Sequence, residues 1–249
     1  MRIALFRSCK KRAGRYLPAL VAACYLCAAL LLFYSAGVLP TAATNLPLSG
    51  QTFVVDAGHG GTDGGAVGEN GTVEAPLNLS VALFLAEELR KQGAEVLLTR
   101  TGPGAIAATK KEDMALRQAI MGTEGVTASV SIHMNKHTEP KPNGPRVFYQ
   151  EGSEKSHLLA LALQNALDDA TGRERKTPVS GDYMVLNTQN TSVIVECGFL
   201  SNPEEEALLQ TEDYQKLLAR TIAAALSRYY GVTVDFAPAA QESCAALFS

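Results

Sequence analysis

The chain has 249 residues, 47% of them hydrophobic, which is enough to build one domain with a sizeable apolar core. Its formal net charge is −3, but six basic residues precede the first acidic residue, Asp56, and leave 16 basic and 25 acidic side chains after residue 15. Nucleic-acid backbones are bound by clustered lysines and arginines, and an acidic body lacks them. Nucleic acid is therefore not an expected partner.

The N-terminal segment is predicted to enter a membrane. Residues 17–39 carry no charge, and at about 1.5 Å per residue a helix of this length crosses a hydrocarbon core of about 30 Å. Basic residues stand only before it, which places residues 1–15 in the cytoplasm as a basic tail and makes 16–39 a transmembrane anchor. The alternative is a signal segment that is cleaved, in which case the protein is secreted. Under both readings the rest of the chain is extracytoplasmic.

After this segment, residues 40–50 are predicted to be a linker, 51–231 a catalytic domain and 232–249 a flexible tail without periodicity. Apolar runs predict strands at 51–55, 95–99, 127–132, 146–150, 183–186 and 192–196. Helical periodicity predicts helices from 76 to about 92, at 112–121, at 154–170 and at 211–230. Strands alternating with helices indicate an α/β fold in which helices sandwich a largely parallel sheet.

Two details of this pattern lead to specific expectations. In the helix at 154–170, we expect Leu158, Leu161, Ala162 and Leu167 to face the core. Between the first strand and the first helix lies a glycine-rich loop of about 17 residues, and loops of that length within a compact domain are usually functional.

Four side chains are the candidates for chemistry. His59 follows the first strand, His133 closes the third, Glu196 ends the strand at 192–196, and Glu74 stands at the start of the first helix. Ligands of open α/β sheets bind beyond the carboxyl ends of the strands, where residues distant in sequence meet. Two imidazoles and one carboxylate leave a fourth position on Zn²⁺ open for water, and a second carboxylate can then move protons.

Other interpretations of the same residues remain open from spacing alone. Glu74 could serve only to interact with a helix dipole, Glu196 could pair with Arg100, and the glycine cluster could be a simple turn. His137 and His157 are expected to be surface side chains. A compact metal-binding motif, with ligands a few residues apart, is not present.

Several separated motifs resemble those of one family. Residues 54–61 (VVDAGHGG), followed by DGGA at 63–66, resemble the opening signature of the type-3 family of zinc N-acetylmuramoyl-L-alanine amidases. SIHMN at 131–135 is similar to its second histidine motif, and VECGFLSN at 195–202 to its closing one. The resemblance covers about residues 51–230 in the order of the family, which makes it specific.

The resemblance implies a mixed sheet sandwiched by helices and a zinc hydrolase that cuts the amide between N-acetylmuramic acid and L-alanine in peptidoglycan. It places the zinc ligands on His59, Glu74 and His133 and the catalytic carboxylate on Glu196. Contacts to the substrate are expected from a further small set: Asn135, Gly60 and Gly61.

The chain departs from the family pattern at the second ligand. Relatives often have lysine after that glutamate, whereas Ala75 and Pro76 follow Glu74, so Glu69 is the fallback ligand. Cys197 lies beside the proposed acid, but strand alternation should turn it into the core.

A narrower resemblance points to the germination-specific, spore-cortex branch of the family. It rests on LPLSG at 46–50, the N-terminal anchor and RYY at 228–230. It implies a role in sporulation and germination and a polysaccharide deacetylase in the same pathway. Two other functions are alternatives to the amidase activity: an anchored, inactive peptidoglycan-binding or activator module, and a zinc peptidase acting on stem peptides.

Some relatives carry an extra helix between the second histidine and the closing glutamate, which covers the site. Here the unassigned segments 136–145 and 172–181 are rich in Pro, Gly, Lys and Thr and are poor helix formers. We therefore expect an open zinc groove.

Overall fold

The computed structural model describes residue 25 and residues 46–231. The predicted tail at 1–15, the tail at 232–249 and, apart from Tyr25, the predicted anchor at 16–39 lie outside these residues. Within the described part of the chain, no helix has both the length and the apolar character needed to cross a bilayer.

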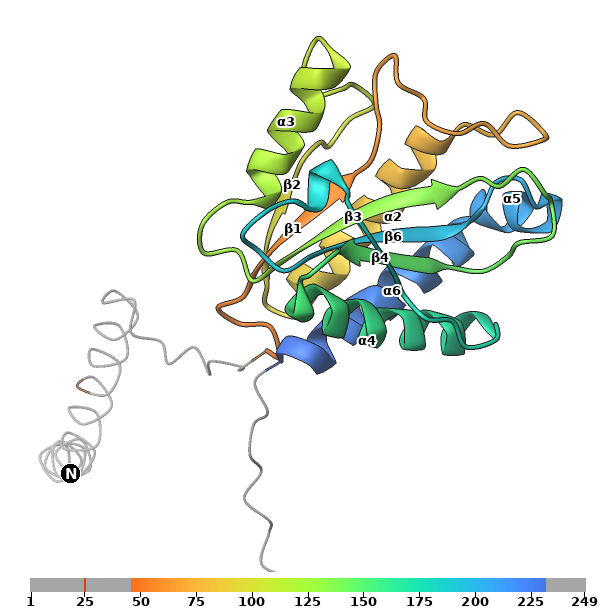
Figure 1. The fold of residues 1–249 in the computed structure, drawn as a ribbon. Helices are drawn as coiled ribbons and strands as arrows, with labels where there is room; N and C mark the ends of the chain where they lie inside the picture. The colour runs from red at the N-terminus through yellow and green to blue at the C-terminus, as the bar shows by residue number, and fades with distance from the viewer. Residues whose placement is uncertain (1–24, 26–45, 232–249) are drawn as a thin grey trace, which may run out of the picture. The chain divides into compact units, whose positions relative to one another are not determined.

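The fold is a mixed α/β structure around a six-stranded sheet, as predicted (Figure 1). The strand order is β2-β1-β3-β6-β4-β5; the first four are mutually parallel, and β4 runs antiparallel to β6. The strands are β1 (Thr52–Ala57), β2 (Glu95–Leu98), β3 (Ala128–Asn135), β4 (Arg146–Gln150), β5 (Val179–Gly181) and β6 (Ser192–Phe199). The helices are α2 (Glu74–Lys91), α3 (Lys110–Met121), α4 (Glu154–Thr171), α5 (Pro203–Leu209) and α6 (Glu212–Tyr230), with a 3₁₀ turn, η1, at Met184–Leu186.

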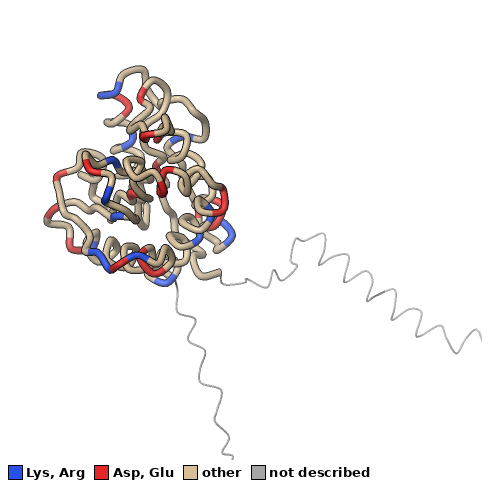
Figure 2. Tube along the Cα trace, turned by 90° about the vertical axis from the view of Figure 1, so that its right-hand side faces the viewer, with Lys and Arg blue, Asp and Glu red and all other residues tan. Residues whose placement is uncertain are grey.

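Side chains alternate between two different faces of the sheet. On the core face, Val55, Ile132 and Val195 are fully buried in the cluster that α2, α4 and α6 complete. On the opposite side, which we name the site face, Val54 and Ile194 pack in a smaller cluster with residues of α3 and η1. Figure 2 shows acidic and basic residues intermingled along the domain.

The apolar face of α4 differs from the expectation. Leu159, Leu163 and Leu167 are fully buried, whereas Leu158 and Leu161 are 45% and 38% exposed, so only Leu167 of the leucines was placed correctly. Leucine and alanine occur on nearly every side of this helix, and its periodicity is therefore ambiguous. The inward side is fixed by packing on β4 and α6.

Two further elements differ from the prediction. The run at 183–186 is not a strand, because Met184–Leu186 form η1; the neighbouring strand is instead β5 at Val179–Gly181, which pairs with β4. Helix α5 was not predicted. It begins where the Asn202 side chain accepts the backbone N–H groups of Glu204 and Glu205 and Pro203 occupies the first turn.

Candidate metal centre

His59 lies just beyond β1, where the chain turns sharply. It has a left-handed backbone with a φ of 61°, and it is the single non-glycine residue with positive φ within residue 25 and residues 46–231. Its Nδ1 lies 3.1 Å from a carboxylate oxygen of Asp63, and its Nε2 lies 3.3 Å from Oε2 of Glu74. With Nδ1–H donating to Asp63, the Nε2 side of the ring faces the glutamate, where it can carry either a proton that Glu74 accepts or a metal ion in place of that proton.

Glu74 is the first residue of α2 and is 3% exposed. Its Oε2 accepts the backbone N–H of Ala66 at 2.8 Å, and its Oε1 accepts from Asn78 Nδ2 at 3.0 Å and from the backbone N–H of Met134 at 3.1 Å. These bonds, together with the N-terminus of the helix, stabilise a buried negative charge. Glu69, the alternative ligand, is exposed.

His133 comes from β3, just before a register shift between His133 and Asn135. Its Nδ1 lies 2.9 Å from Glu74 Oε1, and its ring stands at 79° to that of His59, with ring centroids 4.9 Å apart. The ring lies directly over Gly58, where a Cβ would overlap it. A Cβ at Gly65 would likewise overlap the Glu74 carboxylate.

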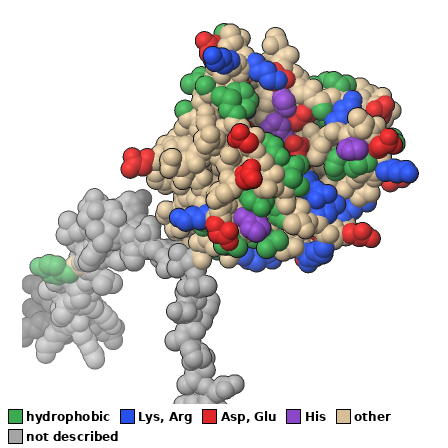
Figure 3. Space-filling model, viewed as in Figure 1, with side chains coloured by type: hydrophobic (Ala, Val, Ile, Leu, Met, Phe, Trp, Pro, Cys, Tyr) green, Lys and Arg blue, Asp and Glu red, His purple; other side chains and the backbone are tan. Residues whose placement is uncertain are grey.

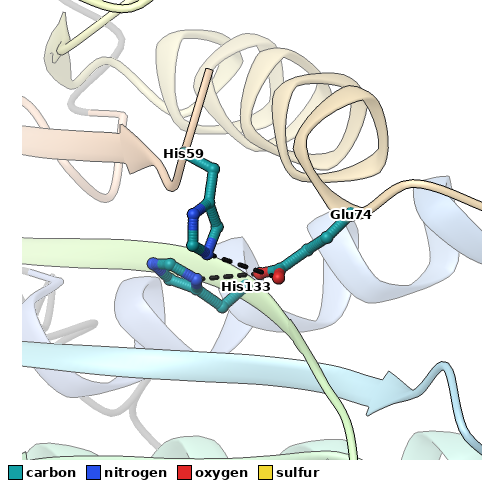
Figure 4. A group of neighbouring side chains, drawn as sticks. All are labelled: His59, Glu74 and His133. Carbon is teal, nitrogen blue, oxygen red and sulfur yellow. Dashed lines mark hydrogen bonds and ion pairs between the residues drawn. The ribbon is translucent and has the colours of Figure 1, made fainter. Parts of the chain in front are cut away.

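Three side chains distant in sequence thus converge on one point. One ligand atom from each of His59, Glu74 and His133 lies within 4.8 Å of the other two (Figure 4). Two ring nitrogens around one carboxylate are a donor set that suits a transition-metal ion, and three protein ligands leave a coordination position open, as in catalytic zinc sites. The residues fit a metal ion in type and arrangement.

The charges in this cluster reinforce one another. Burial raises the pKa of Glu74, but hydrogen bonds and charge attraction from His133 and His59 outweigh it and hold that pKa far below its usual range. Burial lowers the pKa of both histidines, yet the hydrogen bond with Glu74 raises the net pKa of each ring above its ordinary value. Glu74 is therefore an anion between two imidazole rings, each of which readily binds a proton. A metal ion can take the place of those protons.

Glu196 lies on β6 directly across from His133 in the strand pairing. Its Oε2 is buried and has no hydrogen-bond partner among the described residues. Burial and the negative charge of Glu74 raise the pKa of Glu196 to about 7, against the opposing pull of His133. Arg100 does not pair with it, because that guanidinium donates to backbone carbonyls instead. Cys197 points into the core, as expected.

A pocket of about 350 Å³ adjoins the cluster on the site face. His59 and His133 form one side of it, and polar and apolar side chains share the rest. These include Asp63, Lys110, Met114, Asp182, Tyr183 and Met184. Figure 3 shows hydrophobic side chains gathered beside histidines on this side of the molecule.

The three expected substrate contacts lie at the ends of the same strands. Asn135 ends β3 and is half-buried, and its carbonyl accepts the N–H of Leu200. The N–H groups of Gly60 and Gly61 already donate to the carbonyls of Asp63 and Pro103. Any contact of these glycines with a substrate therefore uses other atoms.

Sequence reasoning missed the buried polar groups beneath the site: Asn78, Arg100 and Arg117. A signal was available for one of them, because Arg117 stands one turn after Asp113 in α3, the spacing of an ion pair.

Comparisons with known proteins agree with this geometry. Residues 53–228 match the family model described as N-acetylmuramoyl-L-alanine amidase. The germination-specific N-acetylmuramoyl-L-alanine amidase of Bacillus subtilis is 33% identical over 197 residues, which are 75% of this chain and 82% of that protein. The CwlD amidase of Clostridioides difficile, solved in complex with the GerS lipoprotein, superposes with a TM-score of 0.68 at 31% identity, over 72% of this chain and 98% of that one.

A second solved relative is the catalytic domain of the CwlV amidase from Bacillus (Paenibacillus) polymyxa. It gives a TM-score of 0.63 at 31% identity and covers 72% of this chain and 97% of its own. With the family model spanning most of the domain and two structures above 30% identity, the chain belongs to the N-acetylmuramoyl-L-alanine amidase family.

Proposed function

We propose that this amidase hydrolyses the bond between N-acetylmuramic acid and L-alanine in peptidoglycan with a zinc ion held by His59, Glu74 and His133. The observation that carries the proposal is the convergence of these three side chains within 4.8 Å. When bound, zinc supplies a Lewis acid that polarises a carbonyl group and acidifies water. The carboxylate and the two rings provide the electron pairs that hold it.

Glu196 is proposed to carry the proton. Its carboxylate accepts a proton from the attacking water as the oxygen adds to the lactyl carbonyl carbon. It then delivers that proton to the nitrogen of L-alanine as the C–N bond breaks, which leaves a carboxylic acid and a free amine. A pKa of about 7 for Glu196 suits a group that must accept and release a proton in turn.

The other two functions weighed above are less well supported. An inactive binding module is expected to have lost a ligand or the acid, whereas all four side chains are present and three of them converge. A zinc peptidase would share the metal chemistry, and its products distinguish it. We also propose that Asn135, Gly60 and Gly61 contact the substrate near the pocket.

The decisive experiment incubates the zinc-loaded protein with peptidoglycan and identifies the products by mass spectrometry. We expect free stem peptides that begin with L-alanine and glycan strands that carry unsubstituted lactyl groups. Peptide fragments cut between amino acids would instead indicate a peptidase.

The ligand set is tested by metal content. His133→Ala should lower bound zinc and thermal stability together, because a metal that binds the folded state stabilises it. His157→Ala is the matched control, since that ring stacks on Tyr149 away from the cluster. Unchanged zinc in His133→Ala by elemental analysis would remove His133 from the ligand set.

We propose further that the domain works outside the cytoplasm, anchored through residues 16–39, in spore-cortex or cell-wall remodelling. Removal of the stem peptide would create a bare muramic acid residue, which a polysaccharide deacetylase in the same pathway can use. The similarity to the germination-specific amidase supports this role. Deletion of the gene in its own host should reduce the fraction of peptide-free muramic residues in the cortex. An unchanged fraction would reject the proposed role in the cortex.

A further inference from the structure

The left-handed backbone at His59 requires something to hold it. Residues with a Cβ disfavour this conformation because the Cβ crowds the following carbonyl, and glycine usually occupies it. Gly60 and Gly61 follow with φ values of 135° and 61°, so three consecutive residues have positive φ. Such a turn has a defined shape only when its polar groups are fixed by partners.

Arg117 provides the first set of partners. This side chain is 2% exposed and reaches from α3 under the loop. It donates to the carbonyls of Ala57 and His59, each at 2.6 Å, and to the carboxylates of Asp56 at 2.6 Å and Asp113 at 2.5 Å. Both carbonyls that flank Gly58 are therefore held by one planar group, which limits rotation of the peptides that carry His59.

Arg100 provides the second set. It is 6% exposed and forms no ion pair within the described residues. It donates to Ala57 O at 2.8 Å, and its Nη2 bridges Gly58 O at 2.9 Å and Ala75 O at 2.8 Å. Its remaining bond is to Gly102 O at 3.0 Å. The guanidinium thus serves as a geometric link between backbone segments.

The position of that link is informative. Gly58 immediately precedes His59, and Ala75 immediately follows Glu74, so Arg100 joins the residues adjacent to two proposed ligands. Asn78 repeats the link, because its Nδ2 donates both to Gly58 O at 3.1 Å and to Glu74 Oε1 at 3.0 Å. The loop cannot move relative to the start of α2 without breaking these bonds.

We propose that Arg100 and Arg117 are positioning residues that set the spacing between His59 and Glu74 before any metal binds. The inference rests on the proposed zinc ligands. A site ordered in advance loses little conformational freedom when the ion enters, and groups that orient ligands commonly change metal affinity 10–100-fold. The competing view is that the two arginines only stabilise the fold.

The test uses Arg100→Lys, which keeps the charge but cannot bridge two carbonyls with a planar fork. Zinc affinity is measured by competition with a coloured chelator, and thermal stability is measured on the metal-free protein. We expect zinc binding about 10–100-fold weaker. Arg173→Lys is the matched control, since Arg173 pairs with Glu205 away from the loop.

A second measurement addresses the metal-free loop directly. The amides of Gly58, Gly60 and Gly61 are hydrogen-bonded, and their hydrogen exchange should be faster in Arg100→Lys and in Arg117→Lys than in the parent. Parent-like zinc affinity and parent-like exchange in Arg100→Lys overturn the proposal, even if its stability falls. If the parent binds no zinc, the ligand assignment has failed, while the exchange data still decide whether the arginines order the loop.

Discussion

The two faces of the sheet use the same strands for different purposes. Ile132 on β3 and Val195 on β6 point to the core face. The next residue of each strand, His133 or Glu196, points to the site face. The core face is apolar and covered by three helices. The site face carries buried polar groups, including Asp56 and Ser131, which hydrogen-bond to each other.

The contrast teaches that stability and chemistry are separated by side-chain direction rather than by region of sequence. An apolar face needs only close packing. Buried charges must each find partners, and Arg117 meets this need by pairing with Asp56 and Asp113. Glu196 is the exception, because its Oε2 has no partner among the described residues. The following substitutions test the division between the faces.

The largest effect is expected for Glu196→Gln on the site face. The amide keeps the shape of the side chain but cannot accept and return a proton, so turnover should fall about 10²- to 10⁴-fold. Zinc content and the free energy of unfolding should not fall, since the buried charge has no partner to lose. The measurements are peptide release, elemental analysis and urea denaturation.

Glu204→Gln serves as the control for this variant, because Glu204 is an exposed carboxylate on α5. It should retain parent turnover. If Glu196→Gln also turned over near the parent rate, Glu196 would not be the acid–base group.

On the core face, the matched pair Leu163→Ala and Leu161→Ala tests the inward side of α4. Leu163 is fully buried and Leu161 is 38% exposed. Leu163→Ala should lower the free energy of unfolding by about 2–5 kcal/mol, and Leu161→Ala should change it by about 0.5 kcal/mol or less. Both should keep zinc binding and turnover per folded molecule. Equal losses in the two variants would contradict the observed helix orientation.

A smaller, pH-dependent effect is expected where α5 holds the loop before Glu74. Glu206 is fully buried and accepts the backbone N–H groups of Asn70 and Thr72 at 3.1 and 3.2 Å. Burial raises its pKa, but these hydrogen bonds outweigh burial and hold the pKa of Glu206 below its ordinary value of 4.5. Folding therefore favours the ionised form. Its stabilising contribution is complete above that ordinary value and is lost as the pH falls through the lower, folded pKa.

Glu206→Gln should accordingly be about 1–3 kcal/mol less stable than the parent at pH 7, because an amide cannot accept on both of its terminal atoms. The difference should shrink as the pH falls below about 4. Urea denaturation across this range checks it, with Glu204→Gln as the exposed control. A difference that stays constant with pH would show that the charge of Glu206 is not involved.

The smallest effect concerns the uncovered part of the site face. Between His133 and Glu196, the described chain forms β4, α4, β5 and η1 and adds no further helix. We therefore expect the purified, zinc-loaded protein to hydrolyse its preferred peptidoglycan without a partner, and an added protein to leave the rate unchanged. This expectation would be wrong if the folded, zinc-loaded protein were inert and became active only when a partner protein was added.

The sequence predicted five of the six strands, because each of these five is a short apolar run bounded by glycine or polar residues, whereas β5 is not. The motifs that resemble a family also pointed to His59, Glu74 and His133 as candidate ligands, and the structure brings these three side chains together. Periodicity could not orient α4, where leucines occupy most positions. It also misjudged 183–186, because three apolar residues suit a 3₁₀ turn as well as a strand.

Two of the buried charged residues, Arg100 and Glu206, could not be predicted from the sequence for a different reason. Nothing in the residues around Arg100 distinguishes a buried arginine from an exposed one, because its partners are backbone carbonyls from three separate segments. Such partners have no sequence signature. Glu206 is hidden in the same way within a run of three glutamates, of which Glu204 is exposed.

The strand order has a consequence for the timing of folding. β3 pairs with β6, so residues 128–135 find their partners at 192–199 only after a long intervening stretch has been made. Contacts of such high sequence separation form slowly. A nascent chain that lacks β6 has an exposed edge at β3 and no Glu196, even though both histidines are already present. The proposed hydrolytic centre is therefore completed only when nearly the entire domain has been synthesised, and we expect an incomplete chain without Glu196 to have no amidase activity.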